Sequence, residues 1–183
     1  AYNFDLFNTS NISPSDDGRV FLTICNSEMS GCRLVYMEKD KKETFYEIPP
    51  LSSDTFLNTQ AFVTQHNLQR VLYFVSDRNG GFGGLDIWLL IIDVNGNFGV
   101  PINAGHKINS AADEITPFYN QYDGKIYFSS NRTEGVGGFD IYSSQGKLNL
   151  WESPQNVKEL NSNKDDLYLN FYNKNKGYFS SNR

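Results

Sequence analysis

Apolar residues along this chain occur in short clusters that are bounded by turn residues. In the clearest stretch the clusters cover residues 114–119, 125–129, 139–143 and roughly 150–154. Asp123 and Gly124 form a tight-hairpin signal, the glycine-rich residues 135–138 permit positive φ in a wider loop, and Gln145 with Gly146 turns the chain again. Clusters of this length between such turns are typical of strands, not helices. The pattern therefore predicts four successive antiparallel strands.

The same short phrases recur along the chain at a nearly fixed spacing. An apolar residue, Asn and then Ser or Thr occur around Asn8, Asn58, Asn109 and Asn161, which are 50, 51 and 52 residues apart. A Tyr-Phe phrase that ends in Arg follows at residues 73–78, 127–132 and 178–183, with a degenerate version at 21–26. A glycine-rich phrase that ends in Asp and apolar residues recurs at 80–88 and 135–142, displaced by 54 like the Tyr-Phe phrase. Self-similarity of this kind indicates a repeat architecture.

Four antiparallel strands in each period of about 50 residues correspond to one blade of a β-propeller. A solenoid of helical repeats is the alternative, but glycines within each period, together with Tyr-Phe and Ile-Trp pairs, disfavour helices. We therefore predict an all-β fold, a partial β-propeller with three complete four-stranded blades and the start of a fourth. The predicted repeats span approximately residues 7–56, 57–107, 108–159 and 160–183.

The fourth repeat stops after its second predicted strand, so that its blade is incomplete. Propellers normally close into a ring, and an open strand edge invites association with another chain. We therefore expect the sequence to be a piece of a longer protein, and association through the incomplete blade edge is one expected mode of partner binding.

Composition and charge narrow the range of partners. Aromatic residues make up 15% of the chain, which suits half-buried strands. Lys plus Arg total 16 against 21 Asp plus Glu, and the net charge of −5 argues against nucleic acid and against an anionic membrane surface. The longest apolar run, residues 87–92, is far shorter than the roughly 20 residues that span a bilayer, and residues 1–20 lack a signal-peptide pattern. We expect a soluble chain with no nucleic-acid partner and no direct membrane span.

Three repeats carry an Asp or Asn followed by Arg after a predicted strand, and an Asp opens the next strand after a glycine-rich loop. A phosphate cradle is one interpretation, but a phosphate loop leads into a helix and here a strand follows. Recurrence in successive blades favours a structural role, in which Arg78 with Asp86 and Arg132 with Asp140 bind each other or backbone groups. The predicted repeat-structural residues are Asp77, Arg78, Asp86, Asn131, Arg132, Asp140, Asn182 and Arg183.

No catalytic, cofactor-binding or metal-ligating set emerges from the sequence. Residues 93–97 carry oxygen-bearing side chains at alternate positions, but they lack the following Gly and the downstream Glu of a calcium loop, so we predict a plain hairpin turn. His66 and His106 fall in predicted linkers, with no nucleophile elbow in the chain. Neighbouring acids such as Asp16 and Asp17 are expected to point apart, as adjacent residues of a strand do. We therefore expect no enzyme activity, no cofactor and no metal.

The two cysteines fall in the first repeat, where Cys25 ends one predicted strand and Cys32 begins the next. A hairpin at this point brings their Cβ atoms within disulfide range, and two thiols without further ligands do not make a zinc site. We predict a disulfide between Cys25 and Cys32, which implies an oxidising compartment. A pair of reduced, half-buried cysteines is the alternative.

The recurrent phrase at residues 127–132 (YFSSNR), followed by residues 137–142 (GGFDIY), resembles the WD40-like repeat of TolB-type propellers. It resembles more closely the version of that repeat in OmpA-family envelope proteins of Bacteroidetes, as do residues 97–103, 113–118 and 150–157. The cysteine pair of the first repeat resembles the cysteine-bearing opening blade of those proteins. The first repeat also departs from the pattern, because it lacks the glycine pairs and has Arg33 where Asp86 and Asp140 are expected.

This resemblance implies a periplasmic or outer-membrane-associated protein whose propeller joins other modules, often tetratricopeptide repeats and a peptidoglycan-binding OmpA-like domain. One such protein belongs to the type IX secretion system, so gliding or secretion machinery is the most specific role that the resemblance implies. We expect a non-enzymatic interaction or scaffolding module whose partners are other envelope proteins. An accessory propeller of a peptidase or glycoside-acting enzyme is the alternative, since fold alone does not fix function.

Overall fold

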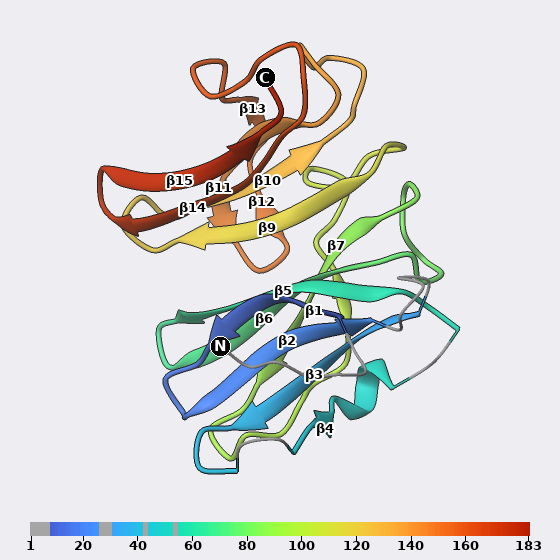
Figure 1. The fold of residues 1–183 in the computed structure, drawn as a ribbon, viewed down its shortest axis with the longest axis vertical. Coiled ribbons are helices and arrows are strands. Elements are labelled where there is room, and N and C mark those ends of the chain that lie inside the picture. The colour runs from blue at the N-terminus through green and yellow to red at the C-terminus, as the bar shows by residue number, and fades with distance from the viewer. Residues whose placement is uncertain (1–7, 26–30, 42–43, 53–54) are drawn as a thin grey trace.

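The computed structural model describes residues 8–25, 31–41, 44–52 and 55–183. These residues form successive antiparallel sheets, which Figure 1 shows as blades stacked side by side in chain order. Residue 7, where the first repeat is predicted to begin, and Asn26, in the degenerate Tyr-Phe phrase, lie outside the described residues. The prediction of an all-β, propeller-like fold with four-stranded blades is confirmed.

Each of the first two blades is a four-stranded sheet in simple up-and-down order. The first blade contains β1 (Asn8–Pro14), β2 (Arg19–Cys25), β3 (Cys32–Glu38) and β4 (Tyr46–Glu47). A short 3-10 helix, η1 (Pro49–Leu51), leads out of it. The second blade contains β5 (Asn58–His66), β6 (Gln69–Ser76), β7 (Asp86–Ile92) and β8 (Ile102–Asn103). His66 therefore ends a strand, and its predicted place in a linker is wrong.

The third blade follows the predicted strands closely, except at its outer edge. It contains β9 (Glu114–Asn120), β10 (Lys125–Ser130) and β11 (Asp140–Lys147). The outer strand is split into β12 (Leu150–Trp151) and β13 (Gln155–Asn156), and both pieces pair with β11. The last described strands are β14 (Asp166–Asn173) and β15 (Lys176–Ser181), which form a two-stranded sheet.

The side chains of a middle strand alternate between two faces and pack against the blade on each side. In β6, Leu72 and Phe74 pack into the apolar cluster shared with the first blade, whereas Val71 and Tyr73 pack into the cluster shared with the third blade. Successive side chains of a strand point to opposite faces, so a strand that is buried on both faces must be apolar throughout. This explains why the central strands read as continuous apolar runs and why the blades stack face to face.

The innermost strands β1, β5, β9 and β14 lie side by side (Figure 1). Each contains a register shift against its neighbouring strand, which is the mark of a β-bulge. Each bulge places one residue in the left-handed region, namely Asn11, Gln60, Thr116 and Tyr168, with φ between 51° and 58°. The same irregularity at the same place in four repeats shows that the repeats are equivalent in backbone geometry as well as in sequence.

The cysteine pair closes the β2–β3 hairpin of the first blade. Cys25 and Cys32 face each other across the two strands and form a disulfide. By register they occupy the places that Ser76 and Asp86 hold in the second blade, so the residue that replaces Asp86 is Cys32 and not Arg33. A disulfide indicates an oxidising, non-cytoplasmic compartment.

In the part of the chain that the structure describes, no helix has the length and apolar character needed to cross a membrane.

Candidate functional site

The Arg residues of the repeats bind the residue that opens the innermost strand of their own blade. The Arg78 Nη2 donates to Asn58 Oδ1 at 2.7 Å, and the Arg132 Nη2 donates to Glu114 Oε1 at 3.0 Å. In the last repeat, the Arg183 Nη2 donates to an Asp166 carboxylate oxygen at 2.8 Å. Of the two alternatives expected from the sequence, direct pairing of Arg78 with Asp86 and of Arg132 with Asp140 is not observed, because each Arg reaches across the sheet instead of along the loop. Binding to a backbone group is observed for Arg132, whose Nη2 also donates to the Ile108 carbonyl oxygen at 2.7 Å.

The loop aspartates bind backbone groups, which is the second alternative that the sequence suggested. Asp86 accepts hydrogen bonds from the amides of Phe82 and Gly83, and Asp140 does the same for Val136 and Gly137. The loop also lies against the next blade, since a Cβ on Gly83 would overlap the backbone carbonyl oxygens of residues 110 and 112. A glycine at this position allows that close approach.

The Asp or Asn that precedes each repeat Arg holds the start of the innermost strand. Asp77 accepts from the Leu57 amide at 2.7 Å, Asn131 from the amide of residue 113 at 2.8 Å, and Asn182 from the amide of residue 165 at 2.8 Å. The Asn of the recurrent Asn phrase makes different contacts in different repeats. Asn58 opens β5, whereas Asn109 lies before β9 and brackets both backbone groups of Ile87. All of these contacts hold loops and blades together.

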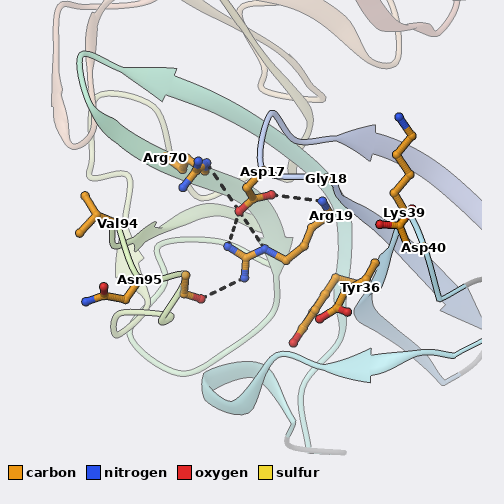
Figure 2. Close-up of a pocket in the computed structure, with 11 residues that line it drawn as sticks. Asp17, Gly18, Arg19, Tyr36, Lys39, Asp40, Arg70, Val94 and Asn95 are labelled. Atoms are coloured by element: carbon orange, nitrogen blue, oxygen red, sulfur yellow. Dashed lines mark hydrogen bonds and ion pairs between the residues drawn. The ribbon is translucent and has the colours of Figure 1, made fainter.

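A polar pocket lies at the opposite end of the strands from the glycine-rich loops. The turns β1–β2 and β5–β6 and the loops after β3 and β7 meet there, and we call this end of the molecule the hairpin face. The pocket has a volume of about 540 Å³ and is open to solvent (Figure 2). The hairpin-face pocket is lined by Asp17, Gly18, Arg19, Tyr36, Glu38, Lys39, Asp40, Arg70, Val94, Asn95 and Gly96.

Arg19 forms the floor of this pocket and has all of its guanidinium nitrogens engaged. Its Nε and Nη2 donate to Asp17 Oδ2 at 2.9 and 2.6 Å, and its Nη1 donates to the Gly96 carbonyl at 3.0 Å. The rings of Phe21, Tyr36 and Phe98 surround it at 5.1–5.7 Å. Burial raises the pKa of Asp17, but the hydrogen bonds from Arg19 outweigh burial and hold that pKa below 3.8. Arg19 is thus a fixed structural cation that ties the first two blades together.

Arg70 is held in a different way, because only one edge of its guanidinium is used. Its Nε donates to the carboxylate of Asp16 and lies 3.6 Å from Asp17 Oδ2. The two acids therefore converge on one cation, and the expectation that they point apart is wrong, since they lie in a turn and not in a strand. The terminal nitrogens Nη1 and Nη2 of Arg70 donate to no residue that the structure describes. Figure 2 shows this guanidinium beside Asp17 at the pocket wall.

Two aliphatic side chains project from the loops around Arg70. Val94 lines the pocket, and Leu68 lies at the tip of the β5–β6 turn, two residues before Arg70. Each is 82% exposed. The turn that carries Val94 is the plain hairpin turn that the sequence predicted, because Asp93 Oδ1 accepts from the amides of Asn95 and Asn97 at 2.8 and 2.9 Å. Among the described residues, no group of three or more His, Cys, Asp or Glu side chains is placed to hold a metal.

A second hollow, of about 230 Å³, lies along the bulges of the innermost strands. Its walls come from all four repeats, and none of the residues that line it carries a charge. Tyr168 and Ile12 are its most exposed large side chains. This central groove therefore offers shape and hydrogen-bonding groups without ionic chemistry.

His66 is buried between the second and third blades, near the hairpin face. Its Nε2 lies 3.0 Å from the Tyr73 hydroxyl, and its ring packs edge-on against Tyr119 at 4.3 Å between centroids. Burial, and to a lesser degree the charge of Lys147, lower the pKa of His66 below 6.5. The folded protein therefore holds this histidine neutral where the unfolded chain already binds a proton.

We predict that His66 makes the protein less stable as the pH falls through 6.5. Below that pH the unfolded chain takes up a proton that the folded chain excludes, so the free energy of unfolding decreases until the lowered folded pKa is reached. Urea unfolding between about pH 7.5 and pH 5.5 measures the effect. His66→Gln should show a shallower decrease over this range, and equal slopes for the two proteins would contradict the prediction.

Comparisons with known proteins bear on the fold. No protein-family model matches the chain, and the search of curated proteins finds no significant match. A solved structure that it resembles is the crystal structure of a thermostable family-43 glycoside hydrolase, with a TM-score of 0.47 and 14% sequence identity. The match covers 74% of this chain and 50% of the hydrolase chain, so the sequence spans about half the length of that structure.

This match corrects one expectation from the sequence. The expectation that the chain is not an enzyme is withdrawn: the solved structure is that of a glycoside hydrolase, and this activity is said of the hydrolase and not of this chain. The comparisons give no support for the WD40-like, OmpA-family or type IX secretion assignment beyond the β-propeller itself.

Proposed function

We propose that this chain is a binding propeller of the cell envelope and that it binds a protein partner at the hairpin-face pocket. The observation that carries the proposal is the state of Arg70. Asp16 fixes its guanidinium through Nε, both terminal nitrogens have no described partner, Val94 lines the same pocket, and Leu68 is exposed on the adjoining turn.

This arrangement has the chemistry of a protein-binding site. Arg is among the residues that dominate binding energy at protein interfaces, where it acts together with apolar neighbours. A guanidinium that is already held in place loses less conformational freedom on binding than a mobile one. Loops on a rigid scaffold are also where binding residues are concentrated, and four loops from two blades meet at this pocket.

The charges of the pocket favour a particular kind of partner. Asp17, Glu38 and Asp40 line it together with Arg19, Lys39 and Arg70, so cations and anions are balanced. A partner segment of mixed charge complements such a wall, and charge complementarity mainly supplies specificity. An acidic side chain of the partner would take the free edge of Arg70.

The compartment of the proposed partner follows from the disulfide and from the sequence resemblance. The Cys25–Cys32 bond favours an oxidising environment, and the resemblance narrows this to the periplasm or the outer-membrane surface. Envelope proteins are thus the proposed partners, with secretion or gliding machinery as the most specific candidate. Association through the edge of β15, and a role as an accessory propeller of a hydrolase, stay predictions.

Photo-crosslinking in cells of the source organism tests the proposal. A benzophenone amino acid at Val94 should capture a defined envelope protein, because the side chain projects at the pocket rim. The matched control is the same probe at Val136, which is 59% exposed in a glycine-rich loop at the other end of the strands. We expect the Val94 product to be lost in an Arg70→Ala protein that still melts cooperatively. Equal products from both positions, or a Val94 product that survives Arg70→Ala, would reject the hairpin-face pocket as the binding site.

A further inference from the structure

Arg78 differs from the matching Arg residues of the next two repeats in one respect. Arg132 and Arg183 each form an ion pair with a fully buried carboxylate, Glu114 and Asp166, at 3.0 and 2.8 Å. At the same place in the second blade stands Asn58, which gives Arg78 a neutral acceptor. No carboxylate lies within ion-pair distance of Arg78 in the part of the chain that the structure describes.

Among the described residues, the groups that contact Arg78 supply no negative charge in place of the carboxylate that the matching Arg residues have. Its guanidinium lies over the rings of Phe74 and Trp88 at 5.0 and 5.4 Å, and its Nε donates to the hydroxyl of Ser76. Burial lowers the pKa of Arg78, which the charge of the neighbouring Asp77 opposes only in part. A half-buried cation with neutral partners is a favourable place for an added anion.

Trp88, beside this cation, has an indole N–H donor that is not used. The side chain is 6% exposed, and its Nε1 has no hydrogen-bond partner among the described residues. Buried polar groups are almost always hydrogen-bonded, and an unpaired buried donor is energetically unfavourable. An acceptor supplied by a ligand would remove that cost.

Arg78 and Trp88 both line one pocket, which lies at the opposite end of the strands from the hairpin face. The pocket has a volume of about 340 Å³, and the residues that line it are Pro50, Phe56, Arg78, Asn79, Trp88 and Pro101. The lining residues are apolar apart from Arg78 and Asn79, and none of them carries a negative charge. A pocket of this size and composition suits a small apolar group that bears an anion.

We propose that this pocket binds a carboxylate attached to an apolar group, with Arg78 as its counter-ion, the Trp88 Nε1 as a hydrogen-bond donor, and Phe56 and the prolines as the apolar wall. The planar guanidinium matches a carboxylate in shape and charge. The protein itself supports the assignment, because the two following repeats set a carboxylate against the equivalent Arg. A free carboxylic acid and the C-terminus of a peptide share this chemistry.

Titration of the ¹⁵N-labelled protein with 3-phenylpropionate tests the proposal, with 3-phenylpropionamide as the uncharged control. We expect the acid, and not the amide, to shift the indole N–H signal of Trp88. A peptide that ends in Phe, with a free or an amidated C-terminus, distinguishes the two sources of the carboxylate. Binding of either acid supports the site, whereas failure of both to shift Trp88 overturns it.

Three substitutions show whether the named residues hold the ligand. Arg78→Gln should weaken binding at least about tenfold, since a hydrogen bond to a charged group contributes about 1.5–3 kcal/mol. Trp88→Phe should weaken it less. Asn58→Asp is the decisive variant, because it supplies the internal carboxylate of the other repeats and should abolish binding while the protein keeps its fold. Unchanged binding in Asn58→Asp would overturn the assignment whatever the hairpin-face pocket binds.

Discussion

Replacement of Glu114 by Ala is expected to lower the free energy of unfolding by about 3–5 kcal/mol, the usual loss when one partner of a buried ion pair is removed. Glu114 is fully buried, and its carboxylate accepts from the Ser110 amide and hydroxyl, the Ser130 hydroxyl and the Arg132 Nη2 at 2.6–3.0 Å. The Ala variant leaves Arg132, which is 13% exposed, without an anion. Urea unfolding with an unchanged slope measures the loss.

Glu114→Gln is the matched control for this variant. It gives Arg132 a neutral acceptor, as Asn58 gives Arg78 in the second blade. We expect it to lose clearly less stability than Glu114→Ala, because most hydrogen bonds persist without the charge. A loss below about 1 kcal/mol in Glu114→Ala would show that the network contributes little and would contradict the prediction.

The recurrence of this network explains why the fold could be predicted from the sequence. The Tyr-Phe phrase ends in Ser, then Asp or Asn, then Arg, and in the second, third and fourth repeats these residues make the same contacts to the start of the innermost strand. The phrase recurs because the same hydrogen bonds are needed in each of these repeats. Its position therefore marks where the equivalent strands lie in the sequence. The partner of each Arg could not be predicted in the same way, because it lies across the sheet, about 20 residues away in sequence.

The phrase that contains Asn58 and Asn109 shows how a repeat can mislead. Its spacing is regular, yet Asn58 opens a strand while Asn109 binds the preceding blade from a connection. The bulge residues give a truer alignment, since Asn11, Gln60, Thr116 and Tyr168 share one backbone conformation. They are four different residue types, Asn, Gln, Thr and Tyr, so no sequence phrase marks them.

The hairpin-face pocket was missed because its residues do not recur. Asp17, Arg70 and Asn95 come from three loops that are far apart in sequence, and only the stacking of the first two blades brings them together. One signal was available. Asp17 and Arg70 flank the first turn of successive predicted repeats, and equivalent turns of neighbouring blades must lie at the same face.

Loss of the disulfide is expected to lower the free energy of unfolding by about 2–3 kcal/mol, because a cross-link over a short loop restricts the unfolded chain by that amount. Cys25 and Cys32 are seven positions apart in the sequence and are the two cysteines of the chain. Urea unfolding with and without a reductant measures the effect. The double variant Cys25→Ser, Cys32→Ser should match the reduced protein and should not respond to the reductant.

A comparison between the blades suggests a further variant for this experiment. Cys25 and Cys32 stand where the second blade has Ser76 and Asp86 and the third has Ser130 and Asp140. In those blades the Asp holds a loop by accepting hydrogen bonds from backbone amides, and that loop contains a glycine pair, which the first blade lacks. Cys25→Ser with Cys32→Asp should therefore be no more stable than the double Ser variant. Recovery of the lost stability by Asp would contradict this prediction. It would mean that the loop of the first blade can adopt the geometry of the matching loops in the second and third blades, and that the disulfide is not needed to replace the hydrogen bonds of their Asp.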